Sequence, residues 1–210
     1  MRKMWVGGNW KMHGSLAQNP VLLAEMQVPN EIDCAIFPAQ MHLVSCQEAA
    51  HERIEIGAQM ISTEEQGAFT GQISAAMVKE AGLTLCMIGH SESRELLGDT
   101  DQRVATKIKL ALETALLPVI CIGEQLDARE NGQTEAVLAE QIDAFLPLLD
   151  EQSDIIIAYE PVWAIGTGKA ATPEMAQQTH AFIRAKLAEC SEAFAQKTRI
   201  VYGGSVKPDN

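Results

Sequence analysis

Short apolar runs alternate with longer amphipathic segments along most of the chain. Seven runs of four or five residues predict buried strands at 5–9, 34–37, 55–59, 85–89, 119–122, 155–159 and 199–202. Segments rich in alanine, leucine, glutamate, glutamine and lysine, such as 99–117 and 172–190, have the composition of amphipathic helices. Because strands and helices alternate, the sequence predicts an α/β protein with a parallel sheet.

The clearest helix start lies at Thr172, which suits an N-cap and is followed by Pro173 at the first helical position. This start bears on "GTGKAA", residues 166–171, which matches the loose G-x-G-x-x-A form of a dinucleotide fingerprint. In that fingerprint the glycines open the helix, whereas here the helix begins after them. A Walker A loop would need glycine where Trp163 stands. Both nucleotide-binding interpretations are therefore weak.

Polar residues at the carboxyl ends of the predicted strands help to choose between an open doubly wound sheet and a (β/α) barrel. Six of the seven strands end in or are followed by such a residue: Lys11, Gln59, His90, Glu124, Glu160 and Ser205. These side chains converge on one point only if the sheet closes on itself. The pattern therefore favours the barrel.

A complete (β/α)8 barrel has eight strands and about 250 residues. We therefore expect an α/β fold of the (β/α)8 barrel type that lacks the eighth strand and helix. It would form a single domain over residues 1–210, incomplete at its C-terminus. The first and seventh strands would each have an unpaired edge. Both an eight-strand curvature with a gap and a seven-strand closure fit this expectation.

Composition narrows the class of protein. Of the 210 residues, 47% are apolar and 21% are charged, and no stretch approaches the roughly 18 apolar residues of a membrane span. The N-terminus does not resemble a signal peptide, so we expect a cytoplasmic protein without a membrane partner. Five scattered cysteines argue for free thiols and against a zinc site. The net charge of -12 opposes nucleic-acid binding.

The segment "YEPVWAIGTGKAATP" carries the strongest chemical signal. Glu160 lies just beyond three isoleucines, and burial of a carboxylate raises its pKa and makes it a stronger base when ionised. A carboxylate at a strand end also commonly caps a helix, which is the alternative role. The following loop has stiff or bulky residues at 161–163 and conformationally free Gly166 and Gly168, as expected of a lid with two hinges.

His90 and Lys11 lie at the ends of two other predicted strands. A helix N-terminus keeps a nearby imidazole neutral, which suits His90 for donating a hydrogen bond to a carbonyl oxygen. Lys11 could hold an anion. Taken singly, the histidine could be structural and the lysine could extend to water. A base, a neutral donor and a cation together predict proton abstraction next to the carbonyl group of an anionic substrate.

The motifs "NWKM", "GAFTGQIS", "IGHSES", "CIGE", "AYEPVWAIGTGKAATP" and "YGGSV" resemble those of the triosephosphate isomerase family, in order and over essentially the whole chain. The resemblance implies a TIM barrel and the interconversion of glyceraldehyde 3-phosphate and dihydroxyacetone phosphate through an enediol(ate), in glycolysis and gluconeogenesis. It implies no cofactor and no metal. In this aldose-ketose isomerase Glu160 would be the base, His90 the electrophile, and Lys11 the group that stabilises negative charge.

The resemblance also assigns supporting positions. Asn9 would shape the substrate site, the amides of Gly166 and Ser205 would hold the phosphate, and Glu92 and Cys121 would support the catalytic residues. A homodimer would form through the loop from Gly67 to Ser74, with Thr70 reaching the partner subunit. The lid would comprise Pro161, Val162, Trp163, Ala164, Ile165, Gly166, Thr167, Gly168, Lys169, Ala170 and Ala171.

Several positions depart from the family pattern. His13 and Met60 stand where the family usually has asparagine, and Ser93 replaces an arginine that braces the third loop, which bears on dimer strength. The family's last strand and second phosphate loop are not in this sequence, so we expect reduced catalytic efficiency. Two alternatives remain: an inactive relative that serves as a binding or assembly protein, and a different sugar-phosphate enzyme, which the combined lid and histidine motifs disfavour.

Overall fold

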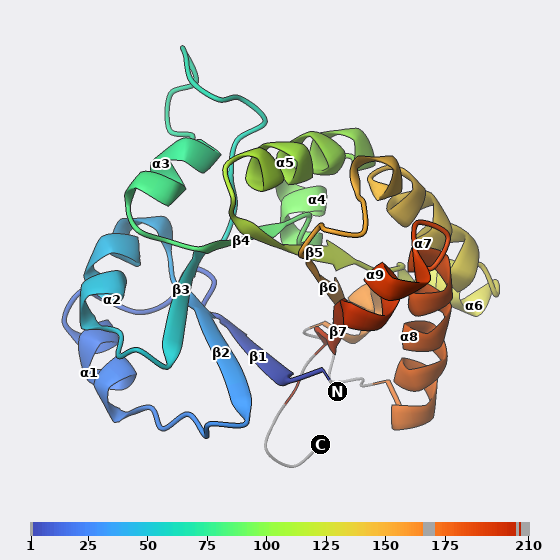
Figure 1. Ribbon diagram of the computed structural model, residues 1–210, viewed down its shortest axis with the longest axis horizontal. Coiled ribbons are helices and arrows are strands. Elements are labelled where there is room, and N and C mark those ends of the chain that lie inside the picture. Colours follow the sequence, from blue (N-terminus) through green and yellow to red (C-terminus); the bar gives the residue numbers. More distant parts are fainter. Residues whose placement is uncertain (1, 166–170, 205, 207–210) are drawn as a thin grey trace. The chain divides into compact units, whose positions relative to one another are not determined.

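The computed structural model describes residues 2–165, 171–204 and 206 (Figure 1). The chain divides into two compact units. Unit 1 comprises Met1–Ile88 and Thr106–Val119, and unit 2 comprises Gly89–Ala105 and Ile120–Asn210. No helix among the described residues is both long enough and apolar enough to cross a membrane.

The described residues contain seven strands, and each pairs with the next one along the chain. They are β1 (Met4–Asn9), β2 (Ile32–Phe37), β3 (Ile54–Ala58), β4 (Leu85–Ile88), β5 (Leu117–Ile122), β6 (Ile156–Tyr159) and β7 (Arg199–Tyr202). The pairs β1-β2, β2-β3, β3-β4 and β6-β7 are parallel. A doubly wound sheet reverses its strand order at a switch point, whereas this order is sequential, as in a (β/α) barrel. The expected fold class, with seven strands, is confirmed.

Helices follow most of the strands, in the alternation that the sequence predicts. The α-helices in the described residues are α1 (Gln18–Glu25), α2 (Leu43–Ala49), α3 (Ala75–Glu80), α4 (Ser91–Leu97), α5 (Asp101–Glu113), α6 (Leu126–Glu130), α7 (Thr134–Asp143), α8 (Pro173–Leu187) and α9 (Glu192–Lys197). Short 3-10 turns occur at η1 (Gln40–His42), η2 (Leu146–Leu148) and η3 (Val162–Ala164).

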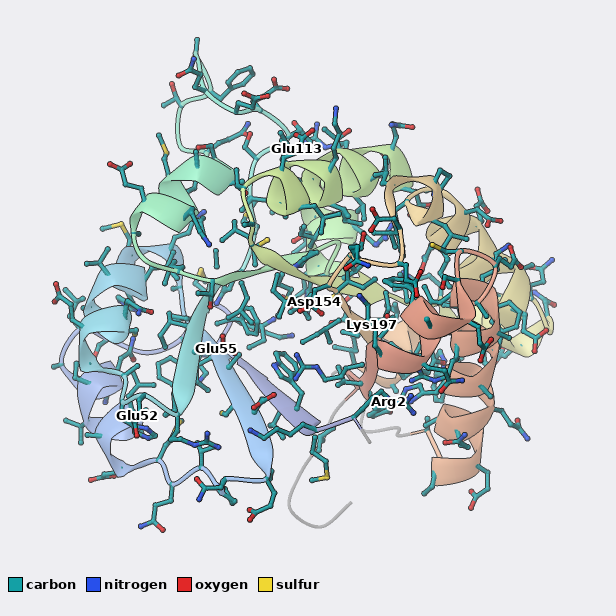
Figure 2. The ribbon with its side chains drawn as sticks, viewed as in Figure 1. Arg2, Glu52, Glu55, Glu113, Asp154 and Lys197 are labelled. Atoms are coloured by element: carbon teal, nitrogen blue, oxygen red, sulfur yellow. The ribbon has the colours of Figure 1, made fainter. Side chains whose placement is uncertain are left out.

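In unit 1, strands β1 to β3 lie beside the helices α1 to α3 (Figure 1). Phe37, at the end of β2, is fully buried, and a Cβ atom on Gly57 would come within 2.4 Å of its ring. Glycine at position 57 therefore leaves room for the phenyl ring. The acidic side chains of Glu52 and Glu55 are exposed (Figure 2), whereas Lys107 of the same unit is buried.

In unit 2, all four residues of β6 are buried. Helix α8 contacts α7 and also α9. The predicted start of α8 is confirmed, because Thr172 Oγ1 accepts a hydrogen bond from the amide of Met175 and Pro173 opens the helix. The helix thus begins after the glycines of 166–171, as the rejection of a dinucleotide fingerprint requires. Lys197 ends α9 and is exposed (Figure 2).

The predicted boundaries differ from the observed ones by up to two residues at strand ends. β2 begins at Ile32 and β5 at Leu117, two residues before the predicted starts. The amphipathic segment 99–117 is helical only from Asp101 to Glu113. The helix cannot extend far beyond Glu113 because Ala115 has φ of +54°, a left-handed conformation incompatible with a continuing right-handed helix.

Candidate active site

Glu160 directly follows the buried strand β6 and is itself only 6% exposed. Its Oε2 accepts a hydrogen bond from the amide of Ser91 at 3.0 Å, and its Oε1 lies 3.2 Å from His90 Nε2. Burial raises the pKa of the Glu160 carboxyl, and the nearby His90 and the Ser91 amide oppose that rise. The carboxylate is thus a strengthened base with a bonding partner at each oxygen.

His90 is the N-cap residue of α4, and its Nδ1 accepts a hydrogen bond from the amide of Glu92 at 3.2 Å. An imidazole nitrogen that accepts a hydrogen bond carries no proton, so this bond assigns the proton of the neutral ring to Nε2. That proton then points to Glu160 Oε1. The Glu92 carboxylate also lies 3.7 Å from Nδ1, which places this supporting residue beside the histidine.

Cys121 lies near the end of β5 and is 1% exposed. Its pKa is raised well above the ordinary value by burial, and the Glu160 carboxylate raises it further. The protonated thiol forms a hydrogen bond with Glu160. The structure therefore places this predicted supporting residue in contact with the predicted base.

Two glycines make room for Glu160. A Cβ atom on Gly123 would lie 1.7 Å from the Glu160 carbonyl oxygen, and one on Gly203 would lie 2.9 Å from Glu160 Cγ. The backbone between them is hydrogen bonded, since the Glu160 amide donates to Ile122 O at 2.7 Å and the Gly203 amide donates to Tyr159 O at 2.7 Å. The ends of β5, β6 and β7 therefore fit together only with glycine at these two positions.

The first residues of the predicted lid are attached to a buried carboxylate. Glu124 is fully buried and accepts hydrogen bonds from Tyr159 Oη at 3.1 Å and from Trp163 Nε1 at 2.9 Å. Arg129 Nη1 lies 3.7 Å from the same carboxylate, and its guanidinium lies 5.8 Å from the centre of a Trp163 ring. Burial raises the pKa of the Tyr159 phenol, and the Glu124 charge adds to the rise, so the phenol remains a donor.

The other end of the lid meets β7, where the amide of Ala171 donates to Tyr202 Oη at 3.2 Å. The Tyr202 ring lies edge-on to the Tyr159 ring, with 6.3 Å between their centres. Gly166, Thr167, Gly168, Lys169 and Ala170 lie outside the described residues, as does Ser205. They include the two residues whose amides are predicted to bind the phosphate, Gly166 and Ser205.

In unit 1, Lys11 has an unusual backbone for a residue other than glycine, with φ of +50°. Its amide donates to Asn9 Oδ1 at 2.9 Å, and its carbonyl accepts from Gln59 Nε2 at 2.8 Å. The same Gln59 nitrogen also donates to Phe37 O at 2.8 Å. Side-chain amides thus hold both backbone polar groups of the predicted catalytic lysine.

The predicted dimer loop also belongs to unit 1. Thr70 is exposed, as is Phe69 at 41% of its surface. The base of the loop is fastened by hydrogen bonds from the Ser62 amide to Ile73 O and from Ser62 Oγ to Gln72 Oε1. Thr70 is therefore presented on a segment that is anchored at its root.

Sequence reasoning missed some of these functional contacts. The sequence places Glu124 at a strand end but indicates neither a role for it nor its partners Tyr159 and Arg129. Tyr159 immediately precedes the predicted base, which was an available signal. No group of three or more histidine, cysteine, aspartate or glutamate side chains in the described part of the chain is arranged to hold a metal ion.

Comparison with known proteins agrees with the motifs. The family model described as triosephosphate isomerase matches residues 4–210. The chain belongs to the triosephosphate isomerase family. The triosephosphate isomerase of Cupriavidus necator is 49% identical over 217 aligned residues, which cover 100% of this chain and 87% of that protein. Those of Thiobacillus denitrificans and Hydrogenovibrio crunogenus are 47% and 44% identical, each covered to 86% of its length and each matching 100% of this chain.

Proposed function

We propose that this chain interconverts D-glyceraldehyde 3-phosphate and dihydroxyacetone phosphate by proton transfer through an enediol(ate). The observation that carries the proposal is the pair formed by Glu160 and His90, in which a buried carboxylate of raised pKa faces the Nε2 proton of a neutral imidazole at 3.2 Å. The family membership supports the same reaction.

In the proposed mechanism Glu160 removes a proton from the carbon next to the substrate carbonyl. His90 Nε2 donates a hydrogen bond to the carbonyl oxygen, which gains negative charge as the C–H bond breaks. A proton also passes from the substrate hydroxyl oxygen to the former carbonyl oxygen, carried by His90 Nε2. Glu160 then returns its proton to the neighbouring carbon, so the isomerisation consumes no other reactant. Its two oxygens contact Ser91 and His90 in this structure, so at least one of these contacts is exchanged for the substrate.

Lys11 and Asn9 are proposed to bind the anionic substrate. Lys11 supplies a positive charge for the phosphate or for developing negative charge, and its constrained backbone limits the directions in which the ammonium can point. The amides of Gly166 and Ser205 are proposed to complete the phosphate site. The lid from Pro161 to Ala171 is proposed to exclude water, with Trp163 attached to Glu124 at its first hinge.

A homodimer through unit 1 is proposed as the assembled form. Large apolar side chains are exposed in the loops and helices that follow β1, β2 and β3. They include Met12, Leu16, Met41, Val44, Phe69 and Met77. Such exposure is typical of a surface that another subunit covers. Thr70 would then contact the partner subunit, and sedimentation equilibrium of the wild-type protein and of Met41→Asp tests this arrangement.

The decisive test of the proposed function is turnover of glyceraldehyde 3-phosphate by the wild type, Glu160→Gln and Glu140→Gln. Glu140 is exposed on α7 and serves as the matched control. Loss of the general base is expected to lower kcat by about 100-fold to 10,000-fold, with Glu140→Gln unchanged. If Glu160→Gln retained wild-type turnover, or if the wild type had none, the inactive-relative alternative would replace this proposal.

Three further expectations stay predictions. They are a single domain over residues 1–210, a location in the cytoplasm, and reduced efficiency of this polypeptide. Comparing its kcat/KM with that of the Cupriavidus necator relative under the same conditions tests the last of these.

A further inference from the structure

Gln141 lies on α7, and its side chain forms two hydrogen bonds with the backbone of Gly123, the residue that follows β5. The Gly123 amide donates to Gln141 Oε1 at 2.9 Å, and Gln141 Nε2 donates to Gly123 O at 3.0 Å. The glutamine is 9% exposed. Its side-chain amide therefore satisfies both polar groups of a glycine backbone, as a neighbouring strand would.

Gly123 stands between two residues that hold the catalytic strand. Ile122 O accepts the Glu160 amide at 2.7 Å, and Glu124 O accepts the Val162 amide at 3.1 Å. Gly123 itself packs so closely on the Glu160 backbone that it has no room for a Cβ atom. A shift of Gly123 is thus transmitted to Glu160 and to the first lid residues.

We propose that Gln141 is a positioning residue for the proposed isomerisation, because it fixes Gly123 and thereby the backbone of Glu160 relative to His90. The expected effect of Gln141 on catalysis rests on the proposed function, in which Glu160 is the base. The two hydrogen bonds of the Gln141 side chain are with Gly123, and not with the reacting carboxylate or the imidazole. Its effect comes from supplying one donor and one acceptor at the spacing of a peptide group.

The first test replaces Gln141 with methionine, which has similar length and no amide. The variant leaves the amide and carbonyl of Gly123 unpaired, and a small displacement of Glu160 is expected to lower kcat by on the order of 10-fold to 100-fold. The KM is expected to change by less than about 2-fold, because the proposed substrate-binding groups are untouched. Two controls are Ile142→Val, which loosens the core of the same helix, and Gln177→Met, which lies exposed on α8.

The second test uses Gln141→Glu, whose ionised carboxylate can accept from the Gly123 amide but cannot donate to Gly123 O. When the new carboxyl is protonated it regains a donor, and both bonds can form again. The kcat of Gln141→Glu divided by that of the wild type should therefore rise as pH falls, over a range where both proteins remain folded. A loss of packing alone would give a ratio that does not depend on pH.

A third readout does not depend on turnover. The Ser91 amide, which donates to Glu160, and the His90 imidazole should shift their nitrogen NMR signals in Gln141→Met but not in Ile142→Val. The proposal would be overturned if Gln141→Met changed neither these signals nor kcat. It would also be overturned if Ile142→Val lost as much kcat as Gln141→Met and the two variants had the same melting temperature. If the wild type were inactive, the proposed function would fail separately, and the NMR shifts would still decide whether Gln141 positions Glu160.

Discussion

The two units prepare their chemical groups in different ways. In unit 1 the constraint lies in the backbone, because Lys11 adopts φ of +50° and the side-chain amides of Asn9 and Gln59 hold it there. Such a conformation costs on the order of 1 to 3 kcal/mol and persists only when its surroundings enforce it. In unit 2 the constraint lies in solvation, because Glu160 is held out of water and its pKa is raised.

Both units nevertheless use a glutamine to fix the main chain. Gln59 donates twice from one nitrogen, to the carbonyls of Lys11 and Phe37. Gln141 donates once and accepts once, both with Gly123. The difference indicates that unit 1 fixes the direction of a flexible side chain, whereas unit 2 fixes the separation of two strand ends. Substitutions in the two units should therefore have different kinetic signatures.

The largest effect is expected from Gly123→Ala. The new methyl group would lie 1.7 Å from the Glu160 carbonyl oxygen, so strands β5 and β6 must separate. We expect the free energy of unfolding to fall by more than about 4 kcal/mol. The control is Gly132→Ala, which has φ of +68° but open space around it and should lose only about 1 kcal/mol. Urea denaturation measures both, and equal losses would disprove the importance of this close approach.

A smaller effect is expected from Gln59→Met in unit 1. Without the amide, the Lys11 carbonyl loses its bond and the strained backbone can relax, so the ammonium is directed less well. We expect kcat/KM to fall by about 10-fold, mostly through a higher KM, because Lys11 is proposed to bind an anion. Steady-state kinetics with Gln18→Met, an exposed residue of α1, as control tests this. If Gln59→Met lowered only kcat, its kinetic effect would be the same in kind as that of Gln141→Met, and the proposed difference between the two units would be wrong.

The smallest effect concerns the pH dependence of stability. Since the pKa of Glu160 is raised on folding, its carboxyl favours the folded state fully below the ordinary glutamate value of 4.5, and this contribution is lost as pH rises through the folded pKa. Glu160→Gln removes that titration. The stability of the variant relative to the wild type should therefore increase as the pH rises above 4.5. Urea denaturation at several pH values measures this difference in the free energy of unfolding. A decrease with rising pH would contradict the conclusion that burial raises the pKa of Glu160.

The fold and part of the site could be predicted from local sequence. Apolar runs predict all seven strands of the described residues, and Thr172 with Pro173 predicts the start of α8, because these signals depend on residues close in the chain. Glu160 and His90 were found because both follow apolar strands. Gln141 could not be found in this way, since it resembles any helical glutamine until folding brings α7 to Gly123. The same holds for the hydrogen bond from Trp163 to Glu124, because these two residues are 39 positions apart in the chain.

The protonated state of Cys121 has a practical consequence. A thiolate is the form that reacts with alkylating reagents, and burial keeps this sulfur in the thiol form. Cys34 and Cys190, which are partly exposed, should consume an alkylating reagent first. Once they are blocked, the rate at which Cys121 is alkylated measures how often the strand ends around Glu160 separate enough to expose its thiol.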